Sequence, residues 1–169
     1  MKNEFAHASH FTSVSNSYWA ANISYIITNG GYGTLASPGS GRTSVIEMWG
    51  WHYGPTLADR RYGLEHSNPV GGAFQSPESE RYTSILENTL TVFGGVIPVG
   101  LNHDLIDITN GAMESAGNDV FGGFTHSGIF GQMNSTIINP AQLKIPLSTV
   151  APSGVTLSQI NALFADYGF

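Results

Sequence analysis

Short runs of β-branched and aromatic residues alternate along this chain with segments that contain glycine and proline. The runs occupy residues 18–28, 42–53, 82–93, 103–109, 135–138 and 143–150. Short apolar runs separated by turn residues are typical of β-strands. The pattern therefore predicts a mainly β fold, namely a sandwich or distorted barrel with long Gly-rich loops.

One helix is predicted, at about residues 156–167. Thr156, followed three residues later by Gln159, forms a capping box in which each side chain bonds a backbone N–H group at the helix start. Gly168 provides a stop. Five apolar residues recur at helical spacing: Leu157, Ile160, Leu163, Phe164 and Tyr167. Such a short helix is stable only when its apolar face is buried, on its own domain or on a neighbouring subunit.

The length of 169 residues suits a single domain, here taken as residues 1–169 with an N-terminal arm at about 1–16. Ser, Thr and Asn in the arm compete with helix formation. The sequence has no Cys and no apolar run of signal-peptide or membrane-spanning length. We therefore expect no membrane insertion, synthesis in the cytoplasm, and a place in a virion or an extracellular assembly.

Charged residues are scarce. Asp, Glu, Lys and Arg make up 11% of the chain, against about a quarter in an average globular domain. Such a surface suits burial against other subunits, because interface centres are depleted in Lys, Glu and Asp; it suits a secreted β-protein almost equally well. Six Lys and Arg against twelve acids, with a net charge of -6, leave no basic surface for phosphates, so no specific nucleic acid partner is expected.

Aromatic residues gather at positions 47–63. On a strand, Trp49, Trp51 and Tyr53 would share one face. That face could form part of the core, a protein interface or a platform for sugar rings. Arg60 and Arg61 follow a turn predicted at Gly54-Pro55 and could pair with carboxylates across an interface.

No motif for catalysis, cofactor binding or metal binding is evident. Six His occur without the paired spacing of metal ligands; His7 and His10 would meet only if the N-terminus were helical. In His103-Asp104 the two side chains would point to opposite faces of a strand, so we expect no acid–base pair there. We therefore predict no catalytic, cofactor-binding or metal-binding residues, no cofactor, and a protein that is not an enzyme.

The favoured function is that of a structural subunit of a symmetric assembly, such as a virus or phage coat, decoration or tail protein. Its partners would be copies of itself and other structural proteins. The interface candidates are Trp49, Trp51, Tyr53, Arg60, Arg61, Leu163, Phe164 and Tyr167. The alternatives are a secreted or surface carbohydrate-binding β-module and a hydrolase whose His and acid residues converge only in the fold.

Overall fold

A computed structural model describes residues 2–62, 96–106 and 120–169. It is 62% helical and 1% strand, and the described part contains no sheet or barrel, so the predicted β-rich sandwich or barrel is wrong. The described helices are α1 (Lys2–Ser13), α2 (Asn16–Asn29), α3 (Ser40–Tyr62), α4 (Leu101–Asp104), α5 (His126–Gln132), the 3-10 helix η1 (Pro140–Leu143), α6 (Lys144–Thr149) and α7 (Leu157–Asp166).

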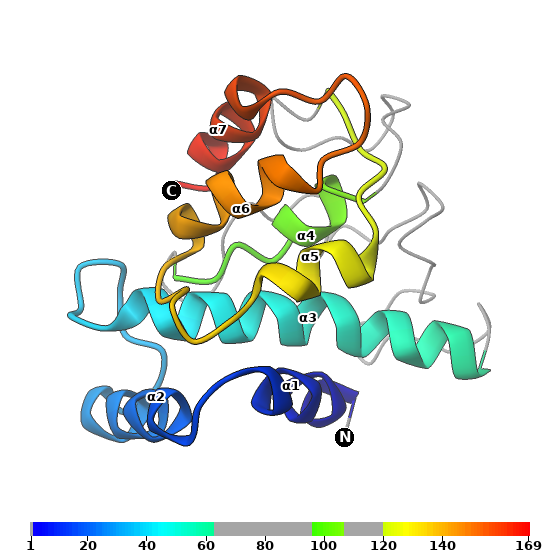
Figure 1. Ribbon diagram of the computed structural model, residues 1–169. Coiled ribbons are helices and arrows are strands. Elements are labelled where there is room, and N and C mark those ends of the chain that lie inside the picture. Colours follow the sequence, from blue (N-terminus) through cyan, green and yellow to red (C-terminus); the bar gives the residue numbers. More distant parts are fainter. Residues whose placement is uncertain (1, 63–95, 107–119) are drawn as a thin grey trace.

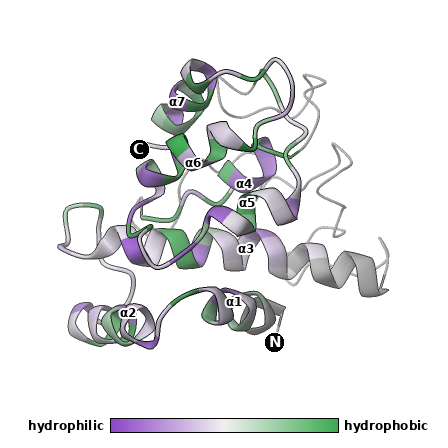
Figure 2. Cartoon of the chain, viewed as in Figure 1, coloured by the Kyte–Doolittle hydropathy of each residue, from purple (hydrophilic) through white to green (hydrophobic). Residues whose placement is uncertain are grey.

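The long helix α3 separates two groups of helices (Figure 1). Helices α1 and α2 lie along one side of it, and α4, α5, α6 and α7 lie on the other. Figure 2 shows hydrophobic stretches on α3, α6 and α7. The core on this side includes Val45, Met48 and Trp49 of α3, Leu101 of α4, Ile129 of α5, Leu147 of α6, and Ile160, Leu163 and Phe164 of α7.

The runs at 18–28 and 42–53, predicted as strands, are α2 and part of α3. Every residue from 43 to 50 in α3 is buried, so this helix has no solvent face there to impose helical periodicity on its sequence. A short apolar run of this kind cannot be assigned to a strand or a buried helix from its pattern alone. Helix α3 also continues through Gly54 and Pro55, where a turn was predicted.

Local signals define both ends of α2. The Ser15 hydroxyl accepts a hydrogen bond from the backbone N–H of Tyr18, as expected of an N-cap residue. At the other end Gly30 has a φ of 65°, and its N–H and that of Gly31 bond to the carbonyl oxygens of Ile27 and Ile26. Only glycine adopts such a left-handed conformation without steric cost, so the NGG segment ends this helix.

The C-terminal helix is present as α7. Gln159 N–H donates to the Thr156 hydroxyl and Thr156 N–H donates to the Gln159 side chain, so the predicted capping box is confirmed. Ile160, Leu163 and Phe164 are buried against the rest of the chain, while Leu157 is exposed. Because α7 packs on α6, its apolar face is covered by its own chain and not by a sheet.

Residues 143–150, also predicted as a strand, comprise the last residue of η1, all of α6 and Val150 instead. Pro146 is the third residue of α6. A proline in the first turn of a helix loses no intrahelical hydrogen bond, because the first four N–H groups have no partner within the helix. This proline is therefore compatible with the helix.

Candidate functional site

The three aromatic residues expected on one strand face lie on helix α3. Trp49 is buried, and its ring stacks on that of Tyr53 with centroids 4.6 Å apart and an angle of 18° between the planes. These two residues are four positions apart and share a helix face, whereas Trp51 lies midway between them in sequence and projects from another side. The three residues therefore do not form one continuous aromatic surface.

The other interface candidates fall in two places. Arg60 and Arg61 belong to the last turns of α3, and their side chains lie outside the described part of the structure. Leu163, Phe164 and Tyr167 are fully buried in their own chain. The Tyr167 hydroxyl donates a hydrogen bond to the carboxylate of Asp104 on α4, which joins the C-terminal end of the chain to the core.

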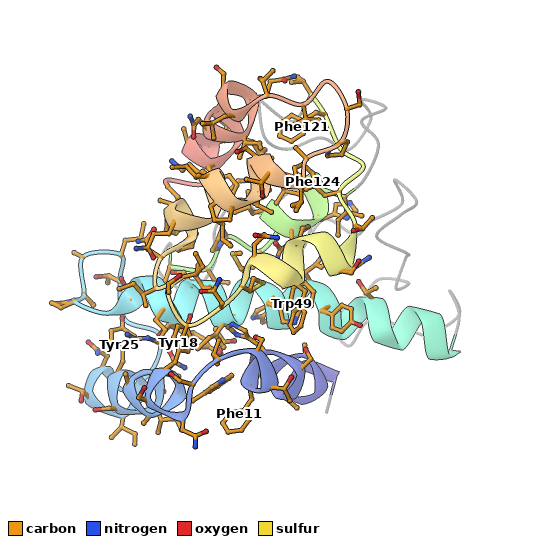
Figure 3. All side chains as sticks on the ribbon, viewed as in Figure 1. Phe11, Tyr18, Tyr25, Trp49, Phe121 and Phe124 are labelled. Atoms are coloured by element: carbon orange, nitrogen blue, oxygen red, sulfur yellow. The ribbon has the colours of Figure 1, made fainter. Side chains whose placement is uncertain are left out.

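Helix α2 faces α3 with a mixed surface made of Tyr18, Asn22 and Tyr25, all of which are buried. The Thr43 hydroxyl of α3 donates to the Asn22 side chain over 2.7 Å. The Arg42 guanidinium lies 5.1 Å from the centre of the Tyr18 ring, a cation–π contact. In Figure 3, Tyr18 and Tyr25 lie between α2 and α3. These contacts set the rotation of α2 about its own axis.

The opposite side of α2 is apolar and exposed. Ile23 is 53% exposed and Ile27 is 76% exposed. Phe11, near the end of α1, is 49% exposed; its ring centroid lies 5.9 Å from that of Trp19 on α2. Figure 3 shows Phe11 pointing away from α3. No Asp, Glu, Lys or Arg occurs from Phe5 to Gly41, the segment that forms most of α1 and all of α2.

Two histidines of α1 meet α3 and α2. His7 Nε2 lies 3.6 Å from Glu47 Oε2, with side chains 25% and 6% exposed. The Tyr32 hydroxyl donates to the same carboxylate oxygen over 3.3 Å. Burial and the neighbouring Glu47 charge raise the pKa of Tyr32 to about 12, so its hydroxyl stays protonated. This pair exists because α1 is helical, contrary to the expectation that Ser, Thr and Asn disfavour a helix there.

His10 is completely buried at the same junction, edge-on to Tyr18 with ring centroids 5.7 Å apart. Neither ring nitrogen has a hydrogen-bond partner among the described residues. Burial, and to a lesser extent the nearby His7, lower the pKa of His10 to about 4. The imidazole is therefore neutral near pH 7, and α1 docks on the rest of the chain without this charge.

A second group of histidines lies between α3, α4 and α5. His52 and His126 stack with ring centroids 5.1 Å apart, and both His52 and His103 are buried. Burial, followed by the proximity of His126 and His103, lowers the pKa of His52 well below its ordinary value. Among described residues no group of three His, Cys, Asp or Glu side chains has the geometry to hold a metal ion.

Sequence reasoning missed both histidine groups. His7 and Glu47 are forty positions apart, and His52, His103 and His126 come from three separate helices. The spacing of His7 and His10, three residues apart, was the one available signal, because it places both imidazoles on one side of a helix. The Ser, Thr and Asn residues of the arm argue against a helix there, so this spacing by itself does not predict the pair.

Within residues 2–62, 96–106 and 120–169, no helix is both long and apolar enough to cross a membrane. Comparison with models of protein families, with curated proteins and with solved structures gave no match for this chain.

Proposed function

We propose that this protein is a structural subunit that assembles with copies of itself. The observation that carries the proposal is the uncharged segment from Phe5 to Gly41, which the fold gathers into one layer, α1 with α2, on one side of α3. All of α2, and α1 from Phe5 onward, is thus built without Asp, Glu, Lys or Arg. Charged residues are scarce throughout the chain, at 11% of residues, and are absent from this segment.

The physical reason lies in the cost of burying charge. An unpaired ionised group moved out of water loses its hydration, so interface centres are depleted in Lys, Glu and Asp. From Phe5 to the end of α2 the α1–α2 layer has no such group, and it exposes Phe11, Ile23 and Ile27 to solvent. Burial of these side chains against another protein surface would be favourable in proportion to the apolar area covered.

This proposal keeps the self-assembling structural subunit of the sequence-based hypothesis but not the coat, decoration or tail protein. Nothing in the described structure or the comparisons supports a virion, capsid or phage setting. The carbohydrate-binding module needs an exposed aromatic face, and Trp49 is buried. We therefore propose self-assembly without assigning a source or a location to the assembly.

Sedimentation velocity of the purified intact chain tests the proposal. We expect species larger than the 18.0 kDa chain, whose proportion rises with protein concentration. A single 18.0 kDa species over the whole soluble concentration range would refute it.

One observation favours a second candidate, the hydrolase. His7 and Glu47 form a His–carboxylate pair from distant parts of the chain, and the His7 side chain reaches solvent. An acid close to an imidazole is a common component of hydrolytic sites, where the imidazole takes a proton from the attacking water or hydroxyl. Because Nε2 of His7 faces Glu47, its other ring nitrogen, Nδ1, would serve as the base.

The hydrolase candidate is tested with p-nitrophenyl acetate as substrate. Hydrolysis above the buffer rate should be lost in both His7→Gln and Glu47→Gln. Exposed imidazole hydrolyses this ester to some extent, so His126→Gln, which removes a half-buried histidine from a different site, is the control. Equal rates in all four proteins would eliminate the candidate.

A further inference from the structure

We propose that a second copy of this chain docks on the outer face of α2, defined here as Asn16, Ala20, Ile23 and Ile27. The inference rests on the proposed function and names the partner and the surface. All four residues are exposed. Their spacings of four, three and four residues place them along one side of the helix, the spacing that lines the seam between two packed helices.

The inner side of α2 is already occupied. Tyr18, Asn22 and Tyr25 face α3 and are held by the hydrogen bond from Thr43 and by the Arg42 contact. Successive residues of an α-helix are rotated by about 100° around its axis, so Tyr18, Asn22 and Tyr25 centre on one side of α2. Ala20, Ile23 and Ile27 lie on the opposite side. The outer face is therefore presented away from the fold to which α2 belongs, and rotation of α2 cannot hide it without breaking the inner contacts.

The solvent side of α2 carries neutral polar residues, the exposed Ser17, Ser24 and Thr28, beside the outer face. An ordinary surface helix turns charged or polar residues towards water and buries its large apolar residues. Helix α2 contains no Asp, Glu, Lys or Arg, and its side towards solvent includes Ile23 at 53% and Ile27 at 76% exposure. Half-buried Trp19 and exposed Phe11 extend the apolar surface towards α1.

A copy of the same chain fits this face better than a charged partner. A partner with acidic or basic residues would find no opposite charge between Phe5 and Gly41. Each copy has a net charge of -6, and all of its Asp, Glu, Lys and Arg residues lie outside the segment from Phe5 to Gly41, so two copies that meet through this segment bring no like charges of that segment together. A two-fold axis across the outer face would pair each α2 with its equivalent, and small Ala20 lets the helices come close.

The test compares Ile27→Asp with Ile145→Asp. Ile145 lies on α6, away from the α1–α2 layer, and is 69% exposed, so the control places the same charge at an equally open apolar site. We expect Ile27→Asp to raise the dissociation constant of the self-associated protein by roughly a hundred-fold, because one buried isoleucine per copy is lost and a charge is introduced. Ile145→Asp should associate like the unaltered protein.

The outcomes separate this inference from the proposed function. If the unaltered chain associates and Ile27→Asp associates equally well, the outer face of α2 is not the contact, although self-assembly stands. If the unaltered chain is a monomer throughout, both fail. Circular dichroism must show equal helix content in the variants; should Ile27→Asp unfold, Ile27→Ser replaces it. Co-sedimentation of a monomeric chain with phosphatidylcholine vesicles, lost in Ile27→Asp, would overturn the inference in favour of a lipid surface.

Discussion

Acid should weaken the docking of α1 through His10. The folded protein lowers the pKa of His10 from 6.5 to about 4, because burial and the neighbouring His7 disfavour the imidazolium. The unfolded chain therefore binds this proton more readily than the folded one. The stability that neutral His10 contributes is complete above pH 6.5, is lost progressively as the pH falls, and changes no further below about pH 4.

The size of the effect follows from the shift. A difference of about 2.5 pKa units between 6.5 and about 4, at about 1.4 kcal/mol per unit, corresponds to a loss of about 3 kcal/mol from this residue. That is a large fraction of the roughly 5–15 kcal/mol that holds a typical domain folded. His10 is completely buried, so solvent screening does not reduce this order of magnitude.

Substitution of His10 by Phe isolates this contribution from the other groups that titrate in acid. Phenylalanine keeps an aromatic ring against Tyr18 and Trp19 but carries no titratable group. Urea unfolding, followed by the helical circular dichroism signal, gives the free energy of unfolding of both proteins from about pH 7 to about pH 4. The difference between them should grow by about 3 kcal/mol towards acid in favour of His10→Phe. Parallel curves over this range would refute the reasoning.

Three further predictions concern a buried histidine, a close backbone contact and a helix cap. His52 is buried, and neither of its ring nitrogens has a hydrogen-bond partner among the described residues. His52→Phe should therefore raise the free energy of unfolding by about 1–3 kcal/mol at pH 7. A decrease would mean that water or other parts of the chain form hydrogen bonds with these nitrogens. A Cβ at Gly41 would lie 2.7 Å from the carbonyl oxygen of Ile138, so Gly41→Ala should lower the melting temperature and cost about 1–3 kcal/mol of stability. A Cβ at Gly131 would meet nothing within 4 Å, so the control Gly131→Ala should be neutral or stabilising. Equal effects of the two substitutions would contradict the close approach of α3 to residue 138. Thr156→Ala removes the N-cap of α7 and should cost about 0.5–2 kcal/mol in chemical unfolding, and no change would show that the capping box contributes nothing.

The contrast between α7 and α2 explains how far the fold could be predicted. Helix α7 has a capping box, a single apolar face and a glycine after its end, all of which act within a few residues. Such local signals can be recognised in one sequence. Helix α2 also has a cap at Ser15 and a glycine stop at Gly30, but its β-branched and aromatic residues on both sides conceal the helical period.

Helix α3 is even harder to predict from the sequence than α2. From residue 43 to residue 50 it is buried on all sides, because α1 and α2 cover one side and α4 and η1 contact it as well. The preference of β-branched and aromatic residues for strands largely reflects how well their side chains pack when buried. A helix that is buried on all sides offers these side chains similar packing, so the same residues are stable in it. Neighbouring helices supply that burial, and no local rule could have shown it.

The candidate sites divide in the same way. The scarcity of charge, including the uncharged segment from Phe5 to Gly41, can be counted in the amino-acid sequence. Which uncharged residues remain exposed depends on the rotation of α2, and this is set by Tyr18, Asn22 and Tyr25 against α3. The contact of His7 with Glu47 and the stacking of His52 on His126 join positions forty or more residues apart. Contacts at such separations form only when the chain is compact, so the tertiary structure alone decides them.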